Sequence, residues 1–167
     1  MSSGRIILAI DPGNIHSGYC VIDYDTYKPL EIGKIDNEDL RINVLGDDRH
    51  EVVIEMIASY GMAVGQTVFD TCVWVGRYYE KARYYNCNPQ LMYRKDVKMN
   101  LCGQTRAKDS NIRQALVDRF SYDRHAAKGG KGTKADPGFF FGFKSDIWAA
   151  FGVGVTYIDQ LKEQQNG

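Results

Sequence analysis

The sequence lacks the features of a secreted, membrane-bound or disulfide-stabilised protein. It has no basic N-terminal segment followed by an apolar run, and no apolar stretch long enough to span a bilayer. Its four cysteines form no C-x-x-C pair, and no paired histidine spacing accompanies them, which argues against a structural zinc site and a disulfide framework. We therefore expect a cytoplasmic protein without a membrane partner.

The chain also lacks net charge, but its charges are unevenly distributed. The 21 Lys and Arg residues are balanced by 21 Asp and Glu residues. The segment 94–134 holds eleven of the basic residues and only four Asp, so its formal charge is +7 and that of the remainder is −7. Such asymmetry is typical of a basic face that binds a polyanion. The alternative is a solvated helix surface.

Short apolar runs predict five strands. The first run, RIILAI, is stopped by Asp-Pro-Gly, as expected for a strand that is buried on both faces. The first three strands follow one another closely, which predicts an antiparallel start to the sheet. The fifth strand is irregular and basic. The expected ranges are 5–10, 18–25, 30–36, 51–58 and 88–101.

Apolar residues at helical spacing predict helices at 66–83, 105–120 and 146–164. The candidate N-caps are Thr67, Thr105 and Ser145. The segment 128–142 is rich in glycine and lysine, and we expect it to form a mobile loop that does not pack. The combination predicts an α/β fold, a mixed five-stranded sheet flanked by helices, in a single domain 1–167.

Three carboxylates stand out because they adjoin apolar segments. Asp11 ends the first strand, Glu55 ends the fourth apolar run, and Asp146 opens the last helix. Each has a plain alternative explanation: a turn for Asp11, a lysine partner for Glu55, and favourable helix-terminus electrostatics for Asp146. If the first and fourth strands are neighbours and the last helix crosses the sheet, however, the three carboxylates converge.

Convergent carboxylates repel one another unless cations neutralise them. Hard oxygen ligands favour Mg²⁺ or Mn²⁺. Two such ions, about 4 Å apart, activate a water molecule and stabilise the leaving oxygen in phosphodiester cleavage. We therefore expect one or two ions per subunit at Asp11, Glu55 and Asp146. Metal ions beside a basic face predict a nuclease.

The stretches LAIDPGNIHSGYCVID, VVIEMIASYG and SDIWAAFGVGV resemble the RuvC family of Holliday junction resolvases, within the RNase H-like superfamily. The match looks closest to the phage-encoded branch, which implies the cytoplasm of a host cell. Supporting stretches are DVKMNLCG, AKDSNIRQAL and the glycine-lysine loop. The resemblance covers nearly the whole chain, and its most specific part is the ordered series of Asp strand, Glu strand, basic strand and Asp helix.

The resemblance implies a homodimer in which each subunit nicks one strand of a four-way DNA junction, using Mg²⁺ or Mn²⁺. Asp11, Glu55 and Asp146 match the metal-binding acids, and Lys98 matches a lysine near the scissile phosphate, where it would offset negative charge. Many members carry an acid or a histidine three residues before the last Asp. Phe143 stands there in this chain, so the second ion lacks that ligand or takes Asp136 from the loop.

Basic residues of the segment 94–134 are candidates for phosphate contacts. They are Arg94, Lys95, Arg106, Lys108, Arg113, Lys128, Lys131 and Lys134. Four aromatic residues are candidates either for stacking on unpaired bases or for the core and dimer interface. They are Tyr60, Phe69, Tyr78 and Tyr79.

Three other functions stay open. The pattern D-P-G-N-x-x-x-G also resembles the phosphate loop of actin-like and sugar-kinase-like ATPases, although the chain is short for their two domains and lacks a second phosphate motif. A catalytically weak protein of the same fold that only binds branched DNA is the second. A nuclease that acts on forks and flaps is the third.

Overall fold

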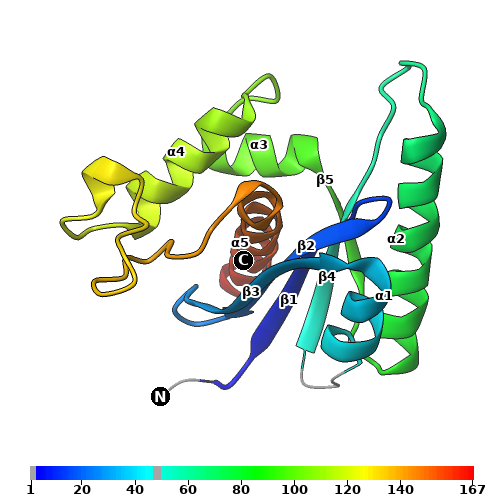
Figure 1. Cartoon of the computed structure of the whole chain (residues 1–167), viewed down its shortest axis with the longest axis horizontal. Helices are drawn as coiled ribbons and strands as arrows, with labels where there is room; N and C mark the ends of the chain where they lie inside the picture. The colour runs from blue at the N-terminus through cyan, green and yellow to red at the C-terminus, as the bar shows by residue number, and fades with distance from the viewer. Residues whose placement is uncertain (1–2, 47–49) are drawn as a thin grey trace.

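A computed structural model describes residues 3–46 and 50–167. Five strands form one mixed sheet in the order β3-β2-β1-β4-β5 (Figure 1). Strands β1, β2 and β3 are antiparallel neighbours, whereas β4 lies parallel to β1 and β5 lies parallel to β4. The strands are β1 (Ile6–Asp11), β2 (His16–Asp23), β3 (Pro29–Asp36), β4 (His50–Met56) and β5 (Gln90–Tyr93). The expected mixed sheet, its antiparallel start and the β1–β4 neighbours are confirmed.

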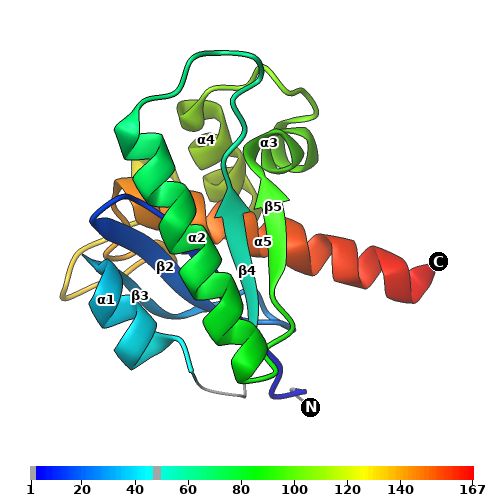
Figure 2. The same ribbon diagram turned by 90° about the vertical axis from the view of Figure 1, so that its right-hand side faces the viewer.

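Helices cover both faces of this sheet (Figures 1 and 2). On one face lies α5 (Ser145–Asn166), with α3 (Arg94–Cys102) and α4 (Asp109–Phe120) packed beside it. The other face is covered by α2 (Gln66–Tyr84) and by the short α1 (Asn37–Asp39), which continues as a π-helical turn. Ile7 and Ala9 of β1 face the α5 side, and Leu8 and Ile10 face the α2 side, which explains why this strand is apolar throughout.

The expected fifth strand is present, but it is much shorter than the predicted range 88–101. Strand β5 pairs with β4 only from Val53↔Gln90 to Met56↔Tyr93, where β4 itself ends. The chain then turns into α3, on which Val97 is buried in the α5-side core and Leu101, four residues later, packs against that core. This helical spacing was present in the sequence, but the basic residues between the two apolar positions obscured it.

The three expected N-caps are also wrong. Helix α2 begins at Gln66 after Gly65, and α5 begins at Ser145 after Lys144. Helix α4 begins at Asp109, where the Asn111 side chain accepts a hydrogen bond of 2.8 Å from the backbone N–H of Lys108. The start of α4 is thus capped by a side chain within the helix. A search for Ser, Thr or Asp at the position before the helix therefore does not find this cap.

The segment 128–142 is packed, contrary to expectation. Phe140 is fully buried and Phe139 packs against Phe120 with nearly parallel rings, 5.3 Å between centroids. The glycines permit this packing: a Cβ at Gly138 would lie 2.3 Å from the carbonyl oxygen of Gly130. The aromatic residues therefore anchor the segment, while its lysines stay at the surface.

The cysteines and the lengths of the helices bear on two further expectations. All four cysteines are free thiols, in agreement with the absence of a disulfide framework. Within residues 3–46 and 50–167, no helix has both the length and the apolar character needed to cross a membrane.

Candidate active site

One row of residues crosses the sheet near the ends of β1 and β4. Lys34 on β3 pairs with Gly18 on β2, which pairs with Asp11 on β1. The last β1–β4 pair is Ile10↔Ile54, so Asp11 and Glu55 follow it side by side. Side chains alternate between the two faces along a strand, and all four residues stand at an even spacing from residues of their own strand that pack in the core under α5. The side chains of Lys34, Asp11 and Glu55 therefore point to the α5 side of the sheet. The sheet therefore presents two carboxylates and an ammonium group on one face, at one end.

Gly18 makes room for the third carboxylate. A Cβ added at Gly18 would lie 2.6 Å from the backbone carbonyl oxygen of Asp146 and 2.7 Å from its Cβ. The first turn of α5 thus rests directly on the glycine in the middle of the row. The missing side chain at Gly18 brings Asp146 to the same end of the sheet as Asp11 and Glu55, as the sequence predicted.

The acids are close enough to change one another's ionisation. Burial raises the pKa of Asp11 to about 9, and the charges of Glu55 and Asp146 add to the increase, while Arg94 opposes it. Glu55 is buried as well. In the absence of a further cation, Asp11 is therefore protonated at neutral pH.

Two basic side chains hold the other acids. The ammonium nitrogen Nζ of Lys34 lies 2.7 Å from Oδ2 of Asp146. The Arg94 guanidinium donates a hydrogen bond of 3.1 Å to Oε1 of Glu55 and also pairs with Asp109 at the start of α4. Lys34 and Asp109 were not predicted as site residues. The only sequence signal for Lys34 is its strand position opposite Gly18, which cannot be read without the β2–β3 register.

The donor set suits a hard cation, but the side chains are not grouped around one point. Among the described residues, no three His, Cys, Asp or Glu side chains are arranged to hold a metal ion. With Asp11 ionised, Glu55 Oε2 is nevertheless buried and has no hydrogen-bond partner within the described part of the chain. A buried carboxylate oxygen without a partner is costly, and coordination of a cation would satisfy it. The three acids carry the oxygen ligands that Mg²⁺ and Mn²⁺ prefer, and the strands and α5 bring them to one end of the sheet.

A cleft of about 320 Å³ opens at this end of the sheet, between α4 and α5. Its walls include Asp11, Arg94, Arg113, Asp146 and Trp148. The Arg113 guanidinium carbon lies 5.3 Å from the Trp148 ring centroid, a cation–π distance. The cleft therefore brings two of the predicted phosphate-binding residues, Arg94 and Arg113, to the acids.

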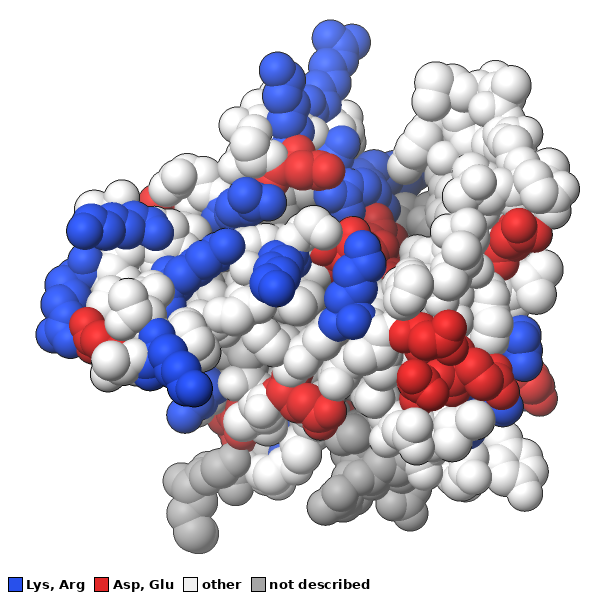
Figure 3. All heavy atoms as spheres, viewed as in Figure 1, with Lys and Arg blue, Asp and Glu red and all other residues white. Residues whose placement is uncertain are grey.

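The remaining predicted DNA-binding residues lie around this cleft or on the aromatic-anchored segment. Exposed side chains at these positions belong to Lys95, Arg106, Lys108, Lys128, Lys131 and Lys134. In Figure 3, basic side chains gather over α3, α4 and the 121–144 region, whereas acidic side chains gather over α1. Lys98 lies on α3 and does not line the cleft. Arg94, four residues earlier on the same helix, does line the cleft, and the role that the resemblance implies for Lys98 stays a prediction.

The contacts of Phe143 and Asp136 bear on the two alternatives for the second ion. Phe143 is buried, with its ring 5.0 Å from both Phe140 and Trp148, so this position serves the core. Asp136 accepts a hydrogen bond of 3.0 Å from Arg124, and this bond lowers the pKa of Asp136. Asp136 also lies 3.3 Å from His125 and does not line the cleft.

The four candidate stacking residues separate into two classes. Tyr78 is fully buried, and its hydroxyl lies 3.0 Å from Ser17 Oγ, so it is a core residue. Tyr79 packs against the α2-side core. Tyr60 and Phe69 are exposed.

Comparisons with known proteins support the fold. No protein-family model matches the sequence, and no curated protein matches it. Among solved structures, RuvC of Thermus thermophilus is similar with a TM-score of 0.70 and 15% identity, covering 95% of this chain and 96% of that chain. T. thermophilus RuvC in complex with a Holliday junction substrate is similar with a TM-score of 0.69 and 16% identity, covering 96% of both chains. The chain therefore has a RuvC-like fold.

Proposed function

We propose that this protein is a metal-dependent, structure-specific DNA endonuclease that nicks four-way junctions, and other branched DNA, by phosphodiester hydrolysis. The observation that carries the proposal is the position of Asp11, Glu55 and Asp146 at one end of the sheet, where Asp11 and Asp146 line a cleft together with Arg94 and Arg113. The similarity to a RuvC that was solved with a Holliday junction substrate supports the choice of substrate. The sequence stretches quoted above further favour the phage-encoded branch of that family, and hence a host-cell cytoplasm.

The chemistry divides between the acids and the basic side chains. Mg²⁺ or Mn²⁺ bound at Asp11, Glu55 and Asp146 would supply an activated water molecule and stabilise charge on the phosphate. Binding of such ions requires Asp11 to lose its proton, because only the carboxylate is a ligand. Arg94 and Lys34, once displaced from Glu55 and Asp146, would be free to pair with DNA phosphate oxygens.

A symmetric dimer would place two such clefts on one junction. Helix α2 carries exposed apolar side chains on its outer face, including Phe69, 55% exposed, and Val73, 61% exposed. These positions are four residues apart and so lie on one helix face. We propose this face as the homodimer contact, in keeping with the symmetry expected of a junction-cutting enzyme.

A second candidate function has an observation of its own. The acids are already paired with Lys34 and Arg94, and they do not form a ready ligand group among the described residues. This arrangement favours a protein that binds branched DNA but cuts it slowly or not at all.

One experiment separates the two functions. Labelled four-way, three-way and linear DNA is incubated with the purified protein, with and without Mg²⁺, and the nicks are mapped. Asp11→Asn, Glu55→Gln and Asp146→Asn are each expected to abolish nicking and leave DNA binding largely intact. The matched control is Asp118→Asn, an acid on the exposed side of α4 that accepts a hydrogen bond from Gln114. Junction binding in Mg²⁺ without nicking would establish the second candidate instead.

A further inference from the structure

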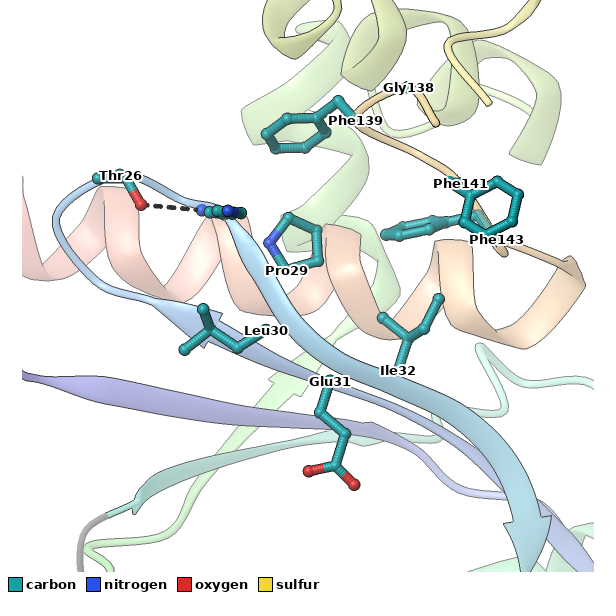
Figure 4. A pocket seen from close by; sticks show the side chains of 10 residues that line it. Thr26, Pro29, Leu30, Glu31, Ile32, Gly138, Phe139, Phe141 and Phe143 are labelled. Atoms are coloured by element: carbon teal, nitrogen blue, oxygen red, sulfur yellow. Dashed lines mark hydrogen bonds between the residues drawn. The ribbon is translucent and has the colours of Figure 1, made fainter. Parts of the chain in front are cut away.

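A groove runs along the edge strand β3 and ends beside the acids. Its first part, about 530 Å³, lies between residues 26–32 and the segment 138–143 (Figure 4). Its second part, about 780 Å³, continues past Gly33 and Lys34 to Ser145 at the start of α5. Ile32 and Phe141 line both parts, so the two parts are adjacent. We refer to the whole as the β3 groove.

One wall of the β3 groove is formed by residues of the strand. Ile32 and Lys34 share strand parity and therefore one face of the sheet, whereas Leu30 lies where the β2–β3 register shifts and does not follow this alternation. Ile32 packs against the α5-side core, whereas Leu30 is 51% exposed. Lys34, at the end of the row, contacts Asp146. The wall therefore leads from an exposed apolar side chain to one of the proposed metal ligands.

The opposite wall comes from the aromatic segment before α5. Phe143 is held in the core, and Phe139 packs on Phe120, while Phe141 between them is 44% exposed (Figure 4). Gly142 has a φ of +83°, and a Cβ there would lie 3.1 Å from Ile32 Cδ1, so this turn is what brings the segment across β3. Phe141 is thus an exposed aromatic side chain on a firmly anchored backbone.

The charges that line the groove are mostly positive. Lys28, Lys34 and Lys144 line it, and the acidic lining residue in the described chain is Glu31, which accepts a hydrogen bond of 2.8 Å from the Tyr19 hydroxyl. Exposed aromatic surface between basic side chains is the combination that binds single-stranded nucleic acid, because bases stack while phosphates pair with lysines.

The edge of β3 is less suited to a protein strand. Pro29 cannot donate a backbone hydrogen bond, and Glu31 and Lys34 place charges along the edge. These are features by which natural sheets avoid pairing with another strand. The occupant that the lining favours is therefore DNA rather than a peptide.

We propose that the β3 groove binds an unpaired DNA strand and directs it to the acids, with Phe141 stacking on a base and Lys28 and Lys144 contacting phosphates. The proposal rests on the proposed function, since it supplies the path by which one strand of a branched substrate reaches the cleft. It also gives the glycine-lysine segment a defined contribution: the part from Gly138 to Lys144 forms the groove wall.

The test uses a four-way junction with 2-aminopurine at positions flanking the branch point, because the fluorescence of this base falls when it stacks. Binding is measured without divalent ions, so that no cutting interferes. Phe141→Ala is expected to restore the fluorescence and to weaken binding roughly 5-fold or more, the effect of losing one stacked base. Phe141→Trp should retain both signals. Tyr122→Ala is the matched control, since Tyr122 is 86% exposed and does not line the groove.

The outcomes for the groove and for the function are separate. Wild-type affinity and quenching in Phe141→Ala would overturn the groove proposal, whether or not the wild-type protein nicks DNA. A loss of self-association in Phe141→Ala with unchanged DNA affinity, measured by sedimentation, would assign the groove to a second copy of the chain and also overturn it. If the wild-type protein nicks no DNA in Mg²⁺ while Phe141→Ala binds the junction more weakly, the proposed nuclease function fails and the groove stands.

Discussion

Replacement of Asp11 by asparagine is expected to stabilise the metal-free protein while it abolishes nicking. The pKa of Asp11 is raised from 3.8 to about 9 by burial and by the nearby carboxylates. The folded protein therefore keeps a proton on Asp11 that the unfolded chain releases above pH 4. The free energy of unfolding therefore suffers no penalty from Asp11 below pH 4, and it decreases as the pH rises from 4 towards 9. Asparagine carries no ionisable proton, so the variant is free of this dependence.

The size of the effect follows from the pKa shift. Each pH unit between the unfolded and folded pKa values costs about 1.4 kcal/mol, so the penalty at pH 7 is at most about 4 kcal/mol. For a chain of this length, 1 kcal/mol moves the melting temperature by about 2–4 °C. Asp11→Asn is therefore expected to melt several degrees above the wild type at pH 8 and close to it at pH 4, which is the trade between stability and activity common at active sites.

The assay is thermal and urea unfolding in EDTA between pH 4 and 9, followed by the same series in Mg²⁺. Mg²⁺ should stabilise the wild type increasingly as the pH rises, because binding displaces the Asp11 proton, and it should leave the variant unchanged. Asp118→Asn serves as the control, with no change in the pH dependence. An Asp11→Asn variant that is no more stable than the wild type at any pH in EDTA would refute the reasoning.

Three further predictions concern the surroundings of the acids. Gly18→Ala should destabilise the protein and reduce nicking, because the added Cβ would lie 2.6 Å from the carbonyl oxygen of Asp146. Unfolding and nicking assays on the same sample test this, and a fully active variant would contradict it. Arg94→Ala should lower the nicking rate more than Lys98→Ala, because Arg94 contacts Glu55 and lines the cleft, and single-turnover rates should rank the two in this order. Phe143→Asp should cost about 3 kcal/mol or more of stability through a buried charge, as measured by urea unfolding, without tighter Mg²⁺ binding by calorimetry.

The acids could be predicted because each breaks a local pattern. Asp11 and Glu55 end runs of residues that are buried on both faces, and the sequence alone is enough to identify a carboxylate at such a position. The neighbouring positions of β1 and β4 needed only one assumption about strand order, which the sheet confirms. Asp146 was found by its place before the most apolar helix.

The partners of the acids could not be predicted in the same way. Lys34 lies in a half-exposed edge strand, where a lysine is ordinary, and its importance depends on the β2–β3 register that places it opposite Gly18. Arg94 was predicted to contact DNA as one of the basic residues of the segment 94–134, and its contact with Glu55 depends on α3 beginning at Arg94. Contacts between residues far apart in the chain decide both cases.

Composition gave a wrong prediction of packing for the glycine-lysine segment, because its few aromatic residues decide its packing and its glycines and lysines do not. Its glycines and lysines indicate an unpacked loop, but Phe140, which is fully buried, and Phe139, which packs on Phe120, outweigh them, since each buried aromatic ring stabilises the fold by about 2 kcal/mol or more. The glycines then serve close approach rather than mobility, as at Gly138 and Gly142. Read in this way, the segment is a wall of the β3 groove.

The row Lys34, Gly18, Asp11 and Glu55 explains how the proposed metal site can be stable without a metal ion. Two carboxylates and the start of α5 bring three negative charges together, and the fold offsets them with a proton on Asp11, Lys34 on Asp146 and Arg94 on Glu55. A metal ion at the acids, as proposed, would displace the Asp11 proton and compete with Lys34 for Asp146 and with Arg94 for Glu55. A one-residue slip of β3 would turn Lys34 to the α2 side and leave Asp146 without its partner. The register of an edge strand, remote from the acids in sequence, therefore sets the charge balance of the site and the ease with which Mg²⁺ enters it.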